Sequence, residues 1–104
     1  MTMGRRKVAV DVCIGREGRY LLRWAGHEVV ARARHGESDR AWFYRARLAG
    51  AEIVISTDAD LEILAFDAGI EVFKHRHGEG EIAAIARFLS TFGAPALTEK
   101  PSAP

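Results

Sequence analysis

Acidic residues stand at the ends of two apolar runs in this chain. Residues 53–64 read IVISTDADLEIL, so Asp58 and Asp60 follow directly after a run rich in Ile and Val. Near the start of the chain, Asp11 interrupts a second apolar run, VAVDV. Clustered carboxylates repel one another and lose hydration unless a proton or a cation compensates their charge. Because Mg²⁺ prefers oxygen ligands and binds through few carboxylates, these acids predict a site for Mg²⁺ or Mn²⁺.

Two further acids, Glu37 and Asp39, lie at the start of a predicted helix. Each acid also has a purely structural interpretation. Asp39 and Asp60 both open predicted helices, where a carboxylate stabilises free N–H groups and the helix dipole, and Glu37 fits a solvated loop. Neither a cap nor a turn requires Asp11. No single acid predicts a metal site. The prediction rests on the expectation that several acids meet at one edge of a sheet.

Hydrophobic periodicity predicts an alternation of strands and helices along the chain. Short runs rich in Val and Ile predict strands at residues 7–12, 27–32, 52–57 and 70–74. Apolar residues at helical spacing predict helices at residues 14–25, 38–49, 61–68 and 79–92. In the last helix we expect Ile82, Ile85, Ala86 and Leu89 to face inward. Glycines stand where the first three helices should end, and no internal repeat is evident.

Strict alternation with short connections predicts a three-layer α/β/α fold, because right-handed crossovers place helices on both faces of a parallel sheet. For four strands the natural order is 2-1-3-4, with strands 1 and 3 adjacent. Sites in such sheets lie outside the carboxyl ends of the strands, where the winding reverses. This order brings Asp11 and Asp58 into one crevice, with Asp39 and Asp60 at its rim.

Length and composition limit the classes of protein. We expect a single domain over residues 1–93, and a disordered tail over residues 94–104, which contain three prolines. The apolar stretches are too short to span a membrane, and no signal peptide is evident. The single cysteine, Cys13, excludes an internal disulfide and fits a buried position in a cytoplasmic protein. Three histidines lack a nearby third ligand and are interpreted as surface loop residues: His35, His75 and His77.

The charge of the chain is close to balanced but unevenly distributed. Residues 16–47 hold eight arginines and four acids, whereas residues 52–81 hold eight acids and two basic residues. A wall that binds phosphates beside a cluster that binds a cation would have this distribution, and so would ordinary surface variation. The candidate contacts to an RNA backbone are Arg16, Arg19, Arg23 and Arg40; the alternative is a solvated outer helix face.

Aromatic residues offer possible contact surfaces on two of the predicted helices. Tyr20 and Trp24 lie four residues apart and fit a partly buried pair, or else a surface that stacks on bases. Trp42, Phe43 and Tyr44 are consecutive, so a helix cannot bury all three. At least one should be exposed, which predicts a contact in a homodimer or with a partner protein.

Several segments of the chain share an order and spacing with a known family. They are VAVDV with Asp11, GHEV after the first helix, SD at Ser38 and Asp39, STDAD with Asp58 and Asp60, and LEILAFDAGIEVF. Together they resemble PIN-like domains, in particular the small bacterial group of the Mut7-C type, over residues 7–75. The resemblance implies a parallel α/β fold. Active relatives are metal-dependent ribonucleases, frequently the toxins of toxin–antitoxin pairs.

Carried over to this chain, the resemblance implies that the catalytic and metal-binding acids are Asp11, Asp39, Asp58 and Asp60. We expect Asp11 and Asp58 to be the principal ligands, with Asp39 and Asp60 completing the coordination, partly through water. Ser38 and Thr57 would support them, the cofactor would be Mg²⁺ or Mn²⁺, and the partners would be RNA and an antitoxin protein. Apart from the resemblance, Ser56 and Thr57 are expected to orient Asp58 by hydrogen bonds and not to act as nucleophiles. The function expected from the sequence is therefore a cytoplasmic, metal-dependent ribonuclease with no contact to membranes.

Three other functions remain open. A PIN-like domain that has lost catalysis would serve as a binding or scaffold subunit. A Toprim-like domain also has two aspartates after a strand, but that family has a glutamate where this chain has Asp11. In a receiver-like domain, Asp11 and Asp58 would form one acidic pocket. Receivers usually have an acid pair after the first strand and a late lysine, for which Lys74 is the only candidate within the fold.

Overall fold

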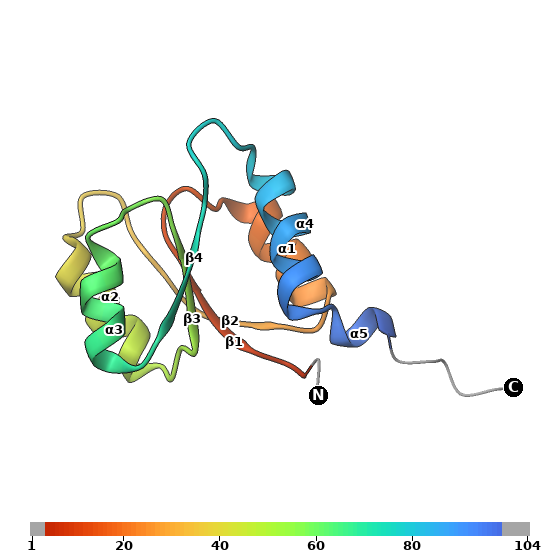
Figure 1. Ribbon diagram of the computed structural model, residues 1–104, viewed down its shortest axis with the longest axis horizontal. Helices are drawn as coiled ribbons and strands as arrows, with labels where there is room; N and C mark the ends of the chain where they lie inside the picture. Colours follow the sequence, from red (N-terminus) through yellow and green to blue (C-terminus); the bar gives the residue numbers. More distant parts are fainter. Residues whose placement is uncertain (1–3, 99–104) are drawn as a thin grey trace, which may run out of the picture.

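A parallel sheet of four strands lies between two layers of helices in the computed structural model, which describes residues 4–98 (Figure 1). The strands are β1 (Lys7–Val10), β2 (Glu28–Arg32), β3 (Ile53–Ser56) and β4 (Glu71–Lys74). The helices are α1 (Arg16–Trp24), α2 (Asp39–Leu48), α3 (Leu61–Ala68), α4 (Glu81–Phe92) and α5 (Pro95–Thr98). The strand order is β2-β1-β3-β4 and every pairing is parallel, which confirms the predicted fold class.

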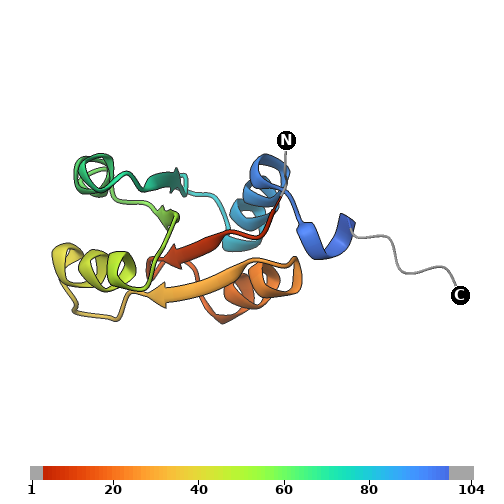
Figure 2. The same ribbon diagram turned by 90° about the horizontal axis from the view of Figure 1, so that it is seen from below.

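Each face of the sheet has its own apolar core. Helices α1 and α4 cover one face, and α2 and α3 cover the other (Figures 1 and 2). Because successive side chains of a strand point to opposite faces, Val8 and Val10 pack with the first pair of helices. Ala9, between them, packs with Trp42 and Phe43 of α2 on the other face. Strand β1 is therefore covered on both sides, and its residues Val8, Ala9 and Val10 are fully buried.

Helix α4 is rotated relative to the face predicted from its sequence. Its buried residues are Ala84, Ile85 and Phe88, whereas Ile82 is 47% exposed and Ala86 is also exposed. The reason is aromatic packing, because the Phe88 ring lies edge-on to the rings of His27 and Phe73. Burial of this large ring stabilises the fold more than burial of the smaller side chains of Ile82 and Ala86 would.

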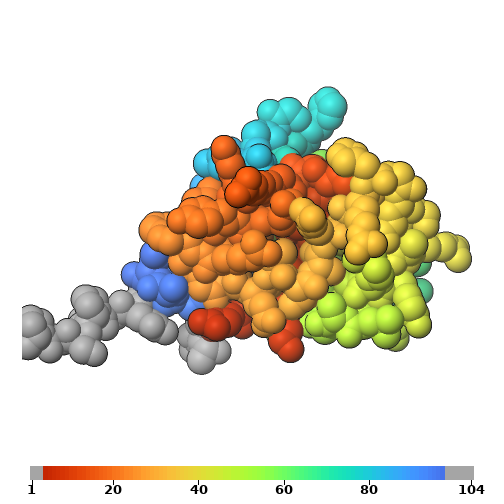
Figure 3. Space-filling model, turned by 180° about the vertical axis from the view of Figure 1, so that it is seen from behind, coloured from red at the N-terminus to blue at the C-terminus, as the bar shows by residue number. Residues whose placement is uncertain are grey.

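Part of the tail expected to be disordered is a short helix. Residues 95–98 form α5, and the Ala96 N–H donates to the Ala25 oxygen at 2.9 Å. In Figure 3, α5 (blue) lies against the end of α1 (orange). Gly26 permits this contact, since a side-chain carbon there would stand 2.7 Å from the Ala96 nitrogen. Residues 99–104 of the predicted tail lie outside the described residues. Within residues 4–98, no helix is long and apolar enough to cross a membrane.

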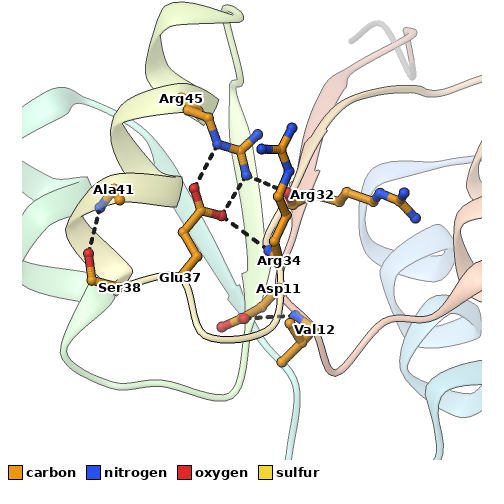
Figure 4. A network of polar contacts seen from close by, with 8 residues as sticks. All are labelled: Asp11, Val12, Arg32, Arg34, Glu37, Ser38, Ala41 and Arg45. Carbon is orange, nitrogen blue, oxygen red and sulfur yellow. Dashed lines mark hydrogen bonds and ion pairs between the residues drawn. The ribbon is translucent and has the colours of Figure 1, made fainter.

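An internal repeat, which the sequence-based prediction missed, joins each edge strand to the helix that follows it. The tetrapeptide RHGE occurs after β2 at residues 34–37 and after β4 at residues 76–79. In the first copy, Arg45 donates two hydrogen bonds to Glu37 and one to the Arg32 oxygen (Figure 4).

The second copy repeats this network with the same spacing. Arg87 donates two hydrogen bonds to Glu79 and one to the Lys74 oxygen. Gly36 and Gly78 both have a positive φ, of 81° and 80°, which favours glycine. The chain is thus built from two similar β-α-β-α halves, which meet where β1 lies beside β3.

Candidate active site at the carboxyl edge of the sheet

The carboxylate of Asp11 is held in place where β1 and β3 end. The Asp11 N–H donates to the Ile55 oxygen at 2.9 Å, which places Asp11 beside Ser56 of the neighbouring strand. The buried Ser56 hydroxyl donates to Asp11 Oδ2 at 2.6 Å, and the Val12 N–H donates to Oδ1 at 2.7 Å. Both carboxylate oxygens of Asp11 are therefore oriented by the protein.

The same serine connects Asp11 to Asp58. Ser56 Oγ accepts a hydrogen bond from the Asp58 N–H at 3.0 Å, and Asp58 Oδ1 accepts one from the Asp60 N–H at 2.9 Å. These bonds shape the turn that leads from β3 into α3. Ser56 and Thr57 were both expected to orient Asp58 by hydrogen bonds. The buried Ser56 makes such a bond, whereas Thr57 is exposed.

Asp39 reaches the site from the first turn of α2, where its protonated carboxyl group is hydrogen-bonded to Asp58. The hydrogen bond between the two carboxyl groups raises the pKa of Asp39 to about 6, with burial and the charges of Asp58 and Asp11 adding to the rise. The same bond, together with the Asp60 N–H, lowers the pKa of Asp58. Carboxylates from α2 and from the end of β3 are thus in direct contact, with Asp11 close enough to act electrostatically on Asp39.

The start of α2 shows why Asp39 is available for this contact. Ser38 is the N-cap residue, and its side-chain oxygen accepts from the Ala41 N–H at 3.2 Å. Asp39 therefore has no need to cap the helix. One turn further along, the indole N–H of Trp42 is buried and makes no hydrogen bond within residues 4–98. The nearby Trp42 side chain lowers the pKa of Asp39, but by less than Asp58, burial and Asp11 together raise it.

Two of the predicted acids lie outside this contact. Asp60 is exposed at the start of α3, its side chain does not cap the helix, and only its backbone N–H touches Asp58. Glu37 is held by the Arg45 guanidinium at 2.6 Å, and this hydrogen bond lowers the pKa of Glu37 to about 2. The structure therefore brings together Asp11, Asp39 and Asp58, and it leaves Asp60 at the rim.

The cysteine and the histidines do not add ligands to the site. Burial, reinforced by the charge of Asp11, raises the pKa of the Cys13 thiol to about 11, so the thiol stays protonated and unreactive at neutral pH. His35 and His77 are exposed as expected. His75, expected at the surface, is buried, and its Nε2 is hydrogen-bonded to the backbone oxygen of Glu79 at 2.6 Å. His27, not considered from the sequence, is buried as well, between Arg6 and Gly93.

The donor atoms of the site suit a hard cation. No group of three or more His, Cys, Asp or Glu side chains in residues 4–98 is arranged to hold a metal ion. Mg²⁺, however, needs only one or two carboxylates, because water and substrate oxygens complete its coordination. The paired carboxylates of Asp39 and Asp58 supply that number, with oxygen as the only donor. The residues present therefore fit Mg²⁺ or Mn²⁺.

The candidate RNA contacts divide between two places. Arg16, Arg19 and Arg23 line one hollow beside β2, together with Arg32. Arg40 lies elsewhere, in a hollow between α2 and α3. Arg32 was not predicted, because nothing in its neighbourhood in the sequence shows that the end of β2 lies beside α1.

Among the aromatic residues, one prediction is confirmed and one is wrong. Tyr44 is 61% exposed while Trp42 and Phe43 are buried, as the consecutive aromatic residues predicted. Tyr20 and Trp24 are not a partly buried pair, since they are 63% and 54% exposed.

Comparison of the chain with protein-family models, with curated proteins and with solved structures found no match. The resemblance to PIN-like domains therefore stays a prediction, and the geometry of the site is the basis for inferring a function.

Proposed function

We propose that the protein is a metal-dependent ribonuclease of the PIN-like type, which hydrolyses RNA phosphodiesters in the cytoplasm. The observation that carries the proposal is the contact between Asp39 and Asp58 beside Asp11. Carboxylates from α2 and from the end of β3 are in contact, with Asp11 nearby at the end of β1, at the sheet edge where doubly wound folds place their sites. Such an arrangement destabilises the metal-free protein, and a divalent cation would relieve the repulsion.

Each acid has a distinct role in the proposed site. Asp39 and Asp58 are the principal cation ligands once their shared proton has left. Ser56 and the Val12 N–H keep Asp11 oriented toward the same space. A cation bound there would lower the pKa of a water molecule and neutralise charge that builds up on the phosphodiester. Asp60 would act at the rim, through its backbone N–H on Asp58.

The position of Asp39 favours a nuclease over a receiver-like domain. A receiver-like pocket would use Asp11 and Asp58 alone, and a carboxylate from α2 would have no role in it. Here Asp39 is freed from helix capping by Ser38 and is in contact with Asp58. A scaffold subunit without catalysis would keep the same fold, so only a test of chemistry distinguishes it from the nuclease.

A protein partner, either an antitoxin or a second copy of the chain, belongs to the same proposal. Its support is a set of large apolar side chains on the outer surfaces of α2 and α3. These side chains are 61–84% exposed: Tyr44, Leu48, Ile63 and Phe66. Apolar side chains that gather on a monomer surface mark contact sites more often than isolated ones do.

Single-turnover cleavage of RNA with Mn²⁺ tests the proposal. We expect wild-type protein to cleave, and Asp58→Asn and Asp11→Asn to lose on the order of 100-fold or more in rate, because each removes a negative charge from the site. Glu62→Gln, an exposed acid on α3, is the matched control and should cleave like wild type.

Thermal unfolding separates the active enzyme from a scaffold. Mg²⁺ or Mn²⁺ should raise the melting temperature of wild type, and Asp58→Asn should lose most of that shift. A shift without cleavage would indicate an inactive PIN-like subunit. Equal cleavage by wild type and Asp58→Asn would trace the activity to a contaminating nuclease and refute the proposal.

A further inference from the structure

Two adjoining hollows follow the outer edge of strand β2. The first, of about 610 Å³, lies between α1 and β2 and is lined by Arg16, Arg19, Arg23 and Arg32, among others. The second, of about 300 Å³, continues past the end of β2. Arg19 and Arg32 line both hollows, which therefore form one depression, called here the β2 groove. Figure 3 shows this face of the molecule, with α1 and β2 in shades of orange and α2 in yellow.

The β2 groove leads to the candidate active site. Its second hollow is lined by Val12, Arg34 and His35, among others. Val12 directly follows Asp11 and donates its N–H to the Asp11 carboxylate at 2.7 Å. A chain molecule lying in the groove would therefore pass from the arginines of α1 to the edge of the carboxylate site.

The arginines of the groove carry positive charge that the described part of the protein does not neutralise. Within residues 4–98 the ion pairs are those of Arg45 with Glu37 and of Arg87 with Glu79. The arginines that line the first hollow, apart from Arg45, have no carboxylate at ion-pair distance in this part of the chain. Burial, followed by the charges of Arg32 and Arg23, lowers the pKa of Arg19. Crowded like charges of this kind are stabilised by a polyanion.

The edge strand itself is poorly suited to pairing with the strand of a partner protein. The pairing of β1 with β2 joins Val8 to Val29 and Ala9 to Ala31, which leaves Val30 as an extra residue. In addition, the Arg45 side chain already occupies the Arg32 oxygen at the end of the strand. Bulges and charged side chains are features by which edge strands avoid pairing. The guanidinium groups without a carboxylate partner, by contrast, match the geometry of phosphate groups.

Exposed aromatic rings favour a single strand over a duplex. Tyr20 and Trp24 lie on α1 outside the lining of the β2 groove, and both are more than half exposed. Tyr20 lines a neighbouring hollow that shares Arg16 with the groove. Unpaired bases stack on such rings, whereas the bases of a duplex are already stacked and paired. Five residues of β2 span roughly 16 Å at about 3.3 Å per residue, which is a length of only a few nucleotides.

We propose that the β2 groove binds the phosphate backbone of single-stranded RNA and directs it to the carboxylate site. The inference rests on the proposed function for the chemistry at the end of the groove. Binding along the groove requires only the arginines, so the groove and the ribonuclease activity can each be refuted without the other.

Binding of a fluorescein-labelled single-stranded RNA, followed by fluorescence anisotropy in EDTA, tests the inference. Wild type should bind, and Arg19→Gln combined with Arg32→Gln should weaken binding at least 10-fold. For every phosphate that the variant no longer neutralises, the negative slope of log K against log salt should become shallower by about 0.7, the value for single strands. Arg47→Gln is the matched control, since this exposed arginine lines the separate hollow between α2 and α3, and it should bind like wild type.

Further arms of the experiment separate the outcomes. Asp58→Asn should bind RNA at least as tightly as wild type while losing cleavage.

Binding that depends on Arg19 and Arg32, in a protein that never cleaves, would support the groove and refute the nuclease. Cleavage and binding that are unchanged in the double arginine variant would refute the groove alone. The groove would also be refuted by tighter binding of a duplex, or of a polyglutamate peptide, than of the single strand.

Discussion

At the scale of single residues, hydrogen bonds decide which acids are available for chemistry. Ser38 caps α2 and so frees Asp39, whereas Arg45 binds Glu37 and removes it from the site. Ser56 has one hydroxyl, and it donates to Asp11 while accepting from the Asp58 N–H. The result is a pair of carboxyl groups that hold one shared proton below about pH 6, and this proton would have to leave before a cation binds.

This shared proton makes the stability of the metal-free protein depend on pH. The pKa of Asp39 rises from 3.8 to about 6 on folding, so the folded state binds the proton more tightly than the unfolded chain. The resulting stabilisation is fully present below about pH 3.8 and is lost as the pH rises through about 6. We expect the free energy of unfolding, measured with urea in EDTA, to fall by at most about 3 kcal/mol between about pH 4 and about pH 7.

Asp39→Asn is the variant that isolates this effect. Its amide can still donate a hydrogen bond to Asp58 but does not titrate, so the fall in stability over this pH range should be much smaller. Asp58 contributes in a lower range, because a carboxyl with a lowered pKa loses its stabilisation only as the pH falls below its ordinary value of 3.8. An unchanged pH dependence in Asp39→Asn would assign it to other titratable groups.

At the scale of secondary-structure elements, helix α4 completes the start of α1. Glu81 Oε2 accepts hydrogen bonds from the Gly15 N–H at 2.7 Å and the Gly18 N–H at 3.2 Å. Gly15, as the N-cap residue, has no side chain for this purpose. A carboxylate at a helix N-terminus also interacts favourably with the helix dipole. The contact couples two elements that together cover one face of the sheet.

Gly18→Ala is expected to destabilise the protein, although alanine is normally the better helix residue by about 1 kcal/mol. The added carbon would stand 2.7 Å from an Ile14 methyl group and 2.8 Å from Glu81 Oε2. We expect the free energy of unfolding to fall by about 1–3 kcal/mol. Ser90→Ala, on the exposed side of α4, is the control and should change little.

A double-mutant cycle identifies the cause. In a Glu81→Ala background one of the two clashes is absent, so Gly18→Ala should cost less than it does in wild type. An equal cost in both backgrounds would show that Glu81 plays no part in the strain.

At the scale of the whole molecule, the two halves place equivalent loops at the two edges of the sheet. Each RHGE loop positions a glutamate to bind an arginine of the following helix, and that arginine also binds the last carbonyl oxygen of the edge strand. Because β1 and β3 meet between the halves, Asp11 and Ser56 lie near the centre of the molecule. The carboxylate site thus forms at the junction of the two halves.

Glu37→Gln and Glu79→Gln should lower the melting temperature by similar amounts at neutral pH. Each removes one of two matching ion pairs, and sites at opposite edges of the sheet should act additively. Hydrogen bonds from Arg45 and Arg87 lower the pKa of Glu37 and of Glu79 to about 2. The stabilisation is therefore present above about pH 4.5, and the difference from wild type should disappear as the pH falls toward 2. Markedly unequal or non-additive losses would show that the two loops are not equivalent.

Local sequence patterns determined the elements and their order in this protein. Runs such as IVIS and the glycines after the helices specify strands and helix ends locally, and right-handed crossovers leave few ways to arrange four parallel strands. Asp11 and Asp58 were expected to be neighbours for this reason, because each follows one of two adjacent strands. The structure places both in one hydrogen-bonded chain through Ser56.

Only the tertiary structure decided which side chains meet across the elements. The pairing of Asp39 with Asp58, the capping of α1 by Glu81, the burial of His75 and the place of Arg32 in the β2 groove all join distant parts of the chain. Such contacts depend on how each helix is rotated about its axis. That rotation is set by the packing of large side chains such as Trp42 and Phe88 against the sheet, which no local pattern specifies.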